Sequence, residues 1–133
     1  MAGKKGVQHA IGGFPILVEN GRRNIVGTPG ENLKRRHTRT AVCTNDRKVI
    51  FVVVDGRQPQ LSVGMTLEEL ADLIVSLGCT TATNTDGGGS SVMAVAAPVG
   101  AQHAVPAHLR VANSPSDGQE RGRGNAWVVL RRN

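Results

Sequence analysis

One segment, MTLEELADLIVSLG (residues 65–78), limits the fold more than any other part of the chain. Thr66 is a favourable N-cap, and Glu69 follows three residues later to complete a capping box. Apolar residues then recur at helical spacing, and Gly78 is a typical C-terminal stop. We therefore expect one principal amphipathic helix over residues 66–78.

Short apolar runs on both sides of this helix predict strands. They cover residues 14–18, 40–44, 48–54, 80–86, 91–100, 109–113 and 125–131, and the polar stretch 24–37 between two of them predicts a loop. We expect 40–44 and 48–54 to form a hairpin, with VIFVVV buried on both faces because polar residues do not alternate along it. Strands before and after one helix indicate an α+β fold. A single domain is expected over residues 1–133, with a flexible N-terminus over 1–10.

Composition narrows the classes of ligand. The 133 residues include no tyrosine, and the aromatic residues are Phe14, Phe51 and Trp127, so stacking platforms for single-stranded nucleic acid are disfavoured. Basic residues outnumber acidic ones by 16 to 10, which gives a net charge of +6. Because arginine binds phosphate through a planar fork of donors, the charge favours a small anionic ligand. A nucleic-acid-binding patch and a merely solvated basic surface are the alternatives.

The cysteines and histidines suggest neither a metal site nor export. Cys43 and Cys79 lack a metal spacing and a disulfide framework, so we expect reduced, buried thiols in a cytoplasmic protein. No signal peptide or transmembrane segment is expected. The four histidines are predicted to be solvated loop residues, and His37 is the one near candidate site residues.

The stretch DGGGSS (residues 86–91) is the first candidate for a ligand site. Consecutive glycines permit close approach and positive φ, so successive backbone amides can surround an anion. The lysine of a phosphate-binding P-loop is absent, and no long helix follows as in a dinucleotide fingerprint. Taken alone, a glycine triplet is more often a tight turn than a ligand site.

The order of motifs resembles the phosphodiester glycosidase family. The matching segments are RTAV, VVVDGR, SVGMTLEELADLIVSLG, TNTDGGGSSVM, VANSPSDGQER and NAWVV, which together run from about Gly12 to Leu130. The resemblance implies an α+β domain with a mixed sheet and a hydrolase that cleaves a sugar-1-phosphate diester. The expected partner is a small sugar-phosphate, with no membrane or nucleic acid. No cofactor is predicted, and the sequence does not decide whether a divalent metal takes part.

The resemblance also implies roles for individual residues. Arg39 would clamp the phosphate, with a salt bridge to Asp55 or Asp86 as the structural alternative. Asp55 and Asp86 are the preferred pair of catalytic carboxyl groups, and Asp117 and Glu120 are alternatives. Arg121 would add a second positive charge. The predicted substrate-binding residues are Thr40, Gly56, Gly87, Gly88, Gly89, Ser90, Ser91, Asn113, Asp117, Arg121 and Asn125.

The N-terminal part departs from the family pattern. Family members carry substantial chain before the position of Gly12, where this sequence has about a dozen residues. We therefore expect a minimal version whose missing pocket wall is supplied by another copy of the chain or is lost. In the second case, the protein would bind a phosphorylated sugar or a nucleotide-like ligand without cleaving it. Hydrolysis is the main hypothesis, and this non-catalytic binding is the alternative.

Overall fold

The computed structural model describes residues 6, 9–27, 30–96, 109–122 and 124–130. The elements are β1 (Ile16–Glu19), β2 (Arg22–Val26), α1 (Glu31–Lys34), β3 (Arg39–Thr44), β4 (Val49–Val54), α2 (Leu67–Ser76), β5 (Thr81–Asn84), the 3-10 turn η1 (Gly88–Ser90), β6 (Ala94–Ala96) and β7 (Leu109–Val111). This arrangement confirms the α+β class with one principal helix. None of the helices in these ranges is long and apolar enough to cross a membrane.

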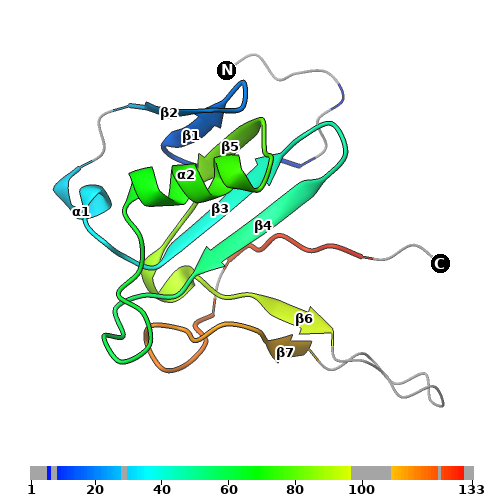
Figure 1. Cartoon of the computed structure of the whole chain (residues 1–133). Coiled ribbons are helices and arrows are strands. Elements are labelled where there is room, and N and C mark those ends of the chain that lie inside the picture. The colour runs from blue at the N-terminus through cyan, green and yellow to red at the C-terminus, as the bar shows by residue number, and fades with distance from the viewer. Residues whose placement is uncertain (1–5, 7–8, 28–29, 97–108, 123, 131–133) are drawn as a thin grey trace.

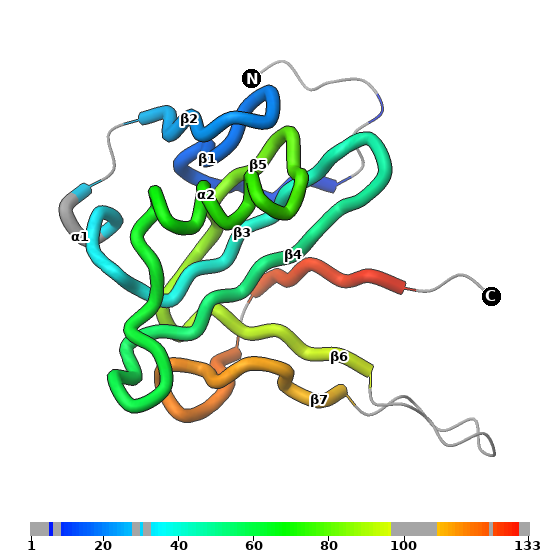
Figure 2. Tube along the Cα trace, in the orientation of Figure 1, coloured from blue at the N-terminus to red at the C-terminus, as the bar shows by residue number. Residues whose placement is uncertain are grey.

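A five-stranded sheet in the order β2-β1-β5-β3-β4 forms the centre of the fold (Figure 1). Every pairing among these strands is antiparallel, whereas the resemblance implied a mixed sheet. Helix α2 lies across one face of the sheet, as the trace in Figure 2 also shows. The apolar core lies between them and consists of Leu17, Val18, Ala41, Cys43, Leu67, Leu70, Ala71, Ile74, Cys79 and Ala82.

The predicted helix is confirmed together with its cap. The Thr66 hydroxyl accepts a hydrogen bond from Glu69 N at 3.2 Å, and the Glu69 carboxylate accepts one from Thr66 N at 2.9 Å. Just beyond the helix, Gly78 adopts φ +77°, a left-handed conformation that favours glycine. The amphipathic pattern and the cap therefore set both ends of α2 locally.

The predicted hairpin is confirmed as β3 and β4, which pair from Arg39↔Val54 to Thr44↔Val49. Asn45 closes the turn because its Oδ1 accepts hydrogen bonds from the backbone N–H groups of Arg47 and Lys48. However, the residues of β4 are half-buried or exposed. The prediction that VIFVVV is buried on both faces is therefore wrong. The physical reason is that α2 packs mainly against β1 and β2, whereas β4 lies at the far edge of the sheet.

Other predicted boundaries also need correction. The expected loop over 24–37 contains the end of β2 and helix α1. The segment 125–130 forms no strand; instead, the Trp127 ring packs 5.9 Å from that of Phe51, centroid to centroid. β6 occupies only three residues of the expected strand 91–100, and residues 97–100 and 131 lie outside the described ranges. An apolar pattern forms a strand only where a neighbouring strand can pair with it.

Cys43 and Cys79 form a disulfide, so the prediction of two reduced thiols is wrong. Their Cα atoms lie 5.9 Å apart because β3 and β5 are neighbours in the sheet and α2 returns the chain to them. The separation of 36 positions along the chain hides this proximity in the sequence. Since disulfides persist mainly in oxidising compartments, the expected cytoplasmic location loses the observation on which it rested.

Three segments that carry candidate residues meet at one end of the sheet. β3 begins at Arg39, β4 ends at Val54 opposite it, and β5 ends at Asn84 opposite Ala41. Because these neighbours are antiparallel, the loop after β4 and the glycine loop after β5 both leave the sheet where β3 begins (Figure 1).

Candidate functional site

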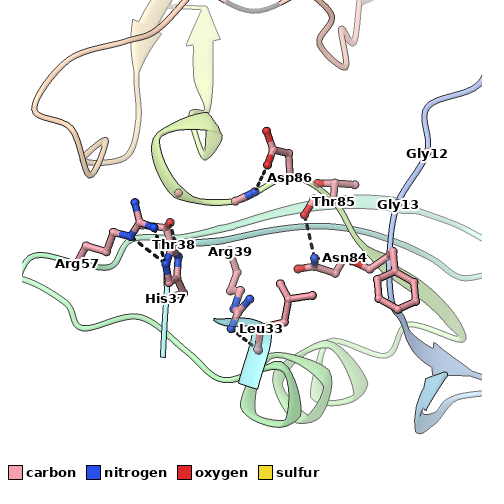
Figure 3. A pocket seen from close by; sticks show the side chains of 13 residues that line it. Gly12, Gly13, Leu33, His37, Thr38, Arg39, Arg57, Asn84, Thr85 and Asp86 are labelled. Atoms are coloured by element: carbon pink, nitrogen blue, oxygen red, sulfur yellow. Dashed lines mark hydrogen bonds between the residues drawn. The ribbon is translucent and has the colours of Figure 1, made fainter. Parts of the chain in front are cut away.

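A cavity of about 760 Å³ opens at this end of the sheet (Figure 3). Its lining residues are Gly12, Gly13, Phe14, Leu33, His37, Thr38, Arg39, Arg57, Asn84, Thr85, Asp86, Gly87 and Gly88. They come from the segment before β1, from α1, from the start of β3 and from the two loops that leave the sheet here. A cavity of this size is large enough for a small-molecule ligand.

Arg39 is held rigidly in the cavity wall. Its side chain is buried, since the residue is only 3% exposed. Nε donates to the carbonyl oxygen of Met65 at 3.0 Å, and Nη2 donates to those of Leu33 and Arg35 at 2.8 and 2.6 Å. Three backbone carbonyls therefore fix the guanidinium group and leave its orientation little freedom.

The charge of Arg39 has no carboxylate partner among the described residues. The alternative role, a salt bridge to Asp55 or Asp86, is therefore not formed. Burial lowers the pKa of Arg39, and the nearby Glu68 carboxylate partly opposes this effect. Because arginine stays protonated in proteins, a buried guanidinium group that forms no salt bridge to a described residue favours an anionic ligand.

A second arginine, Arg57, lines the cavity beside His37 (Figure 3). Its Nε donates to Nε2 of His37 at 2.9 Å, and its Nη2 lies 2.6 Å from the same nitrogen. The Arg57 backbone has φ +58°, a left-handed conformation that costs free energy in a residue other than glycine. Such strain concentrates at functional sites, so it supports a role for the Arg57 side chain.

His37 is neutral near pH 7 in this setting. Burial lowers its pKa below the usual 6.5, and the charges of Arg57 and Arg39 lower it further. Because Nε2 accepts the hydrogen bond from Arg57, the neutral ring carries its proton on Nδ1. This nitrogen lies 3.4 Å from the Thr38 hydroxyl. His37 therefore orients a cavity cation and is more than a solvated loop residue.

The glycine loop packs tightly, which explains why side chains are excluded from it. A Cβ on Gly87 would lie 3.0 Å from the carbonyl oxygen of Thr38, and Gly88 has φ +65°. A Cβ on Gly89 would collide with Asp117, which forms a salt bridge with Arg121. The glycine triplet therefore allows the segments around Thr38 and Asp117 to pack closely against the loop. Of the three glycines, Gly87 and Gly88 line the cavity.

Four of the predicted site residues line the cavity, namely Arg39, Asp86, Gly87 and Gly88. The others lie outside the lining: Thr40, Asp55, Gly56, Gly89, Ser90, Ser91, Asn113, Asp117, Arg121 and Asn125. The Asp86 carboxylate accepts a hydrogen bond from Gly87 N at 2.9 Å. Among the described lining residues, Asp86 is the one with an acidic side chain.

Several predicted residues that lie outside the lining support the loops around it. Asp55 accepts hydrogen bonds from Asn113 Nδ2 at 2.8 Å and from the backbone N–H of Ser114. The Thr40 hydroxyl donates to that of Ser91 at 2.9 Å. These contacts connect the C-terminal end of β4 and the start of β3 to the segments that follow the glycine loop.

Sequence reasoning did not select Arg57 or Asn84, although both line the cavity. Arg57 directly follows the predicted Gly56, and Asn84 stands two positions before Asp86. Asn84 is a polar residue at the end of β5, and Arg57 lies three residues beyond the end of β4, so their positions near strand ends were the signal that could have found them. Gly12, Gly13 and Phe14 join the lining through the fold alone. Within the described ranges, no group of three or more His, Cys, Asp or Glu could hold a metal ion.

Comparison with protein families gives a match over residues 2–130 to the family described as phosphodiester glycosidase. The chain belongs to the phosphodiester glycosidase family. The match covers the elements that build the cavity, from the segment before β1 to the glycine loop. A comparison with curated proteins finds no match.

Two solved structures are similar to parts of this phosphodiester glycosidase family member. A hypothetical protein from Synechocystis has 25% sequence identity and a TM-score of 0.50, and the match covers 59% of this chain and 15% of that one. A putative exported protein from Burkholderia pseudomallei K96243 has 48% identity and a TM-score of 0.41, over 43% of this chain and 11% of that one. The chain therefore spans only a small part of the length of either protein.

Proposed function

We propose that the chain hydrolyses a sugar-1-phosphate diester whose phosphate binds in the cavity beside Arg39, Arg57 and the glycine loop. The observation that carries the proposal is the buried Arg39 guanidinium group, which lines the cavity without a carboxylate partner among the described residues. Binding of an anion would stabilise this buried charge. Membership of the phosphodiester glycosidase family supports a phosphodiester as that anion.

In the proposed reaction, water attacks the anomeric carbon of the sugar while the bond to the phosphate oxygen breaks. The electron pair of that bond leaves with the phosphate, where Arg39 and Arg57 stabilise the negative charge. Asp86 accepts the proton from the attacking water as a general base. A phosphate is a weakly basic leaving group, so the two arginines take the place of the general acid that most glycosidases need.

Binding without cleavage is the alternative function. It is favoured by the lining, because among the described residues Asp86 is present there without the second carboxyl group typical of glycosidases. We also propose that another copy of the chain completes the cavity wall. Analytical ultracentrifugation with and without a sugar phosphate tests this association, and a monomer under both conditions contradicts it.

The decisive experiment incubates the protein with UDP-N-acetylglucosamine and with the methyl phosphodiester of N-acetylglucosamine 1-phosphate. Mass spectrometry then detects free sugar and intact substrate. Asp86→Asn should abolish sugar release and preserve binding. The control Asp72→Asn alters an exposed carboxylate on α2 that pairs with Arg23, and it should release sugar at the wild-type rate. Binding without release by the wild type supports the non-catalytic alternative, and absence of binding contradicts both functions.

A further inference from the structure

Asn84 carries a buried hydrogen-bond acceptor that no described residue satisfies. The residue ends β5 and is 4% exposed. Its Nδ2 donates to the carbonyl oxygens of Phe14 at 2.8 Å and of Thr85 at 2.9 Å. Its Oδ1 has no hydrogen-bond partner among the described residues. Buried polar atoms are rarely left unpaired in native proteins, so this oxygen needs an explanation.

The identity of the unpaired atom follows from its surroundings. Both partners of Nδ2 are carbonyl oxygens, which only accept hydrogen bonds. Turning the amide over would place Oδ1 against these two oxygens and remove both hydrogen bonds. The atom without a partner is therefore an oxygen, and it can pair only with a donor.

Asn84 and Arg39 belong to the lining of the same cavity. Figure 3 shows the side-chain oxygen of Asn84 on the side of the cavity where Arg39 lies. The hydrogen bonds of Arg39 to described residues use Nε and Nη2, so none of them involves Nη1. The buried acceptor of Asn84 on β5 and the buried cation of Arg39 on the neighbouring β3 thus line the same cavity.

We propose that Asn84 Oδ1 accepts a hydrogen bond from a hydroxyl or amide N–H group of the ligand whose phosphate binds at Arg39. The inference rests on the proposed function for the phosphate position. The oxygens of an ionised phosphate diester accept hydrogen bonds and do not donate them, so the phosphate itself cannot satisfy Oδ1. The ligand must therefore carry a donor close to its phosphate, as a sugar phosphate does through its hydroxyl groups.

Phe14 gives this end of the cavity an apolar flank. Its backbone carbonyl holds Asn84, and its ring is half exposed although it belongs to the lining. An aromatic face of this kind can pack against the C–H face of a sugar ring. Asn84 is thereby a specificity-determining residue, because a site that pairs a hydroxyl group leaves its own buried atom unpaired when the ligand lacks that hydroxyl.

The test compares ligands on the wild-type protein, because replacing Asn84 would also break its two backbone hydrogen bonds. Calorimetry measures binding of inorganic phosphate, α-D-glucose 1-phosphate and the 2-, 3-, 4- and 6-deoxy analogues of that sugar phosphate. N-acetylglucosamine 1-phosphate provides an amide donor. At least one deoxy analogue should bind about tenfold more weakly than its parent. Equal affinities for all the deoxy analogues, together with no tighter binding of N-acetylglucosamine 1-phosphate than of glucose 1-phosphate, would overturn the inference.

Side-chain NMR supplies a second, direct readout. The carboxamide ¹³Cγ resonance of Asn84 should shift with glucose 1-phosphate and stay in place with dimethyl phosphate, a diester anion that has no hydrogen-bond donor. Asn45 is the matched control, because its Nδ2 also donates to a backbone carbonyl, that of Gly78, in a remote turn. An equal shift with dimethyl phosphate would overturn the role of Asn84. Failure of phosphate to bind would instead contradict the proposed phosphate site, so the two failures can be told apart.

Discussion

Arg57 donates a hydrogen bond to His37 across 2.9 Å, from Nε to Nε2, inside the candidate cavity. Only the neutral histidine can accept this bond, because both ring nitrogens of the charged form are donors. Burial and the two neighbouring arginines hold the pKa of His37 below its usual value. The position of a cavity cation is thus linked to the protonation state of one histidine.

Replacing Arg57 with Gln should raise the pKa of His37. The variant removes a positive charge and a donor that favours the neutral ring. An NMR titration of the histidine ring measures the change. The control Arg47→Gln lies in the β3–β4 turn at the opposite end of the sheet and should leave the titration unchanged. A His37 pKa that is the same in Arg57→Gln and in the wild type would contradict the proposed coupling.

The free energy of unfolding should decrease as the pH falls below 6.5, the ordinary pKa of histidine. Since the folded-state pKa of His37 is lower than this value, the unfolded chain binds more protons in the window below 6.5. The contribution is fully present above 6.5 and is lost on acidification through the folded-state pKa. Urea denaturation between pH 8 and pH 5 measures it. His37→Gln keeps an acceptor without titrating, so identical pH slopes for both proteins would refute the assignment.

Arg39→Ala should lower the free energy of unfolding by about 3 kcal/mol, because three part-buried hydrogen bonds to backbone carbonyl oxygens are lost. These carbonyls belong to Leu33, Arg35 and Met65. Arg39→Lys retains the charge and should unfold less easily than the alanine variant, yet bind phosphate more weakly than wild type because the planar fork is lost. Urea denaturation and calorimetry measure both effects. The prediction fails if Arg39→Ala is as stable as the exposed control Arg47→Ala.

Removing the Cys43–Cys79 disulfide should lower the free energy of unfolding by about 4 kcal/mol, because the crosslink closes a long loop in the unfolded chain. Urea denaturation of the wild type with and without dithiothreitol measures the loss. The double variant Cys43→Ala, Cys79→Ala is the control, and its midpoint should not respond to dithiothreitol. If reduction leaves the wild-type midpoint unchanged, the disulfide has no stabilising role.

Gly64→Ala should destabilise the protein by about 3 kcal/mol and disturb the cavity. Gly64 has φ +89°, and a Cβ there would collide with backbone atoms of His37. Gly21→Ala is the matched control, since Gly21 has φ +72° with no atom within 4 Å of its Cβ position, and should cost about 1 kcal/mol. Equal losses in the two variants would show that contact with His37 contributes nothing.

The site shows where local sequence patterns stop being informative. Asp86 and Gly87 stand between the end of β5 and the rest of the glycine run, and the structure places both in the cavity wall. Asp55 also follows a strand, yet its carboxylate lies outside the cavity lining and accepts a hydrogen bond from Asn113 in the loop after β7. Contacts with segments distant in sequence decide whether a loop residue at this end of the sheet lines the cavity or binds a neighbouring loop.

The sequence alone determined helix α2 with its Thr66 cap, the β3–β4 hairpin and the α+β class, because capping and periodicity act between residues close in the chain. Only the tertiary structure decided the Cys43–Cys79 disulfide, the edge position of β4 and the meeting of Arg39, Arg57 and Asn84 around one cavity. The order of strands in the sheet creates these relationships. That order follows from the burial of apolar surface by the whole chain, which no local pattern encodes.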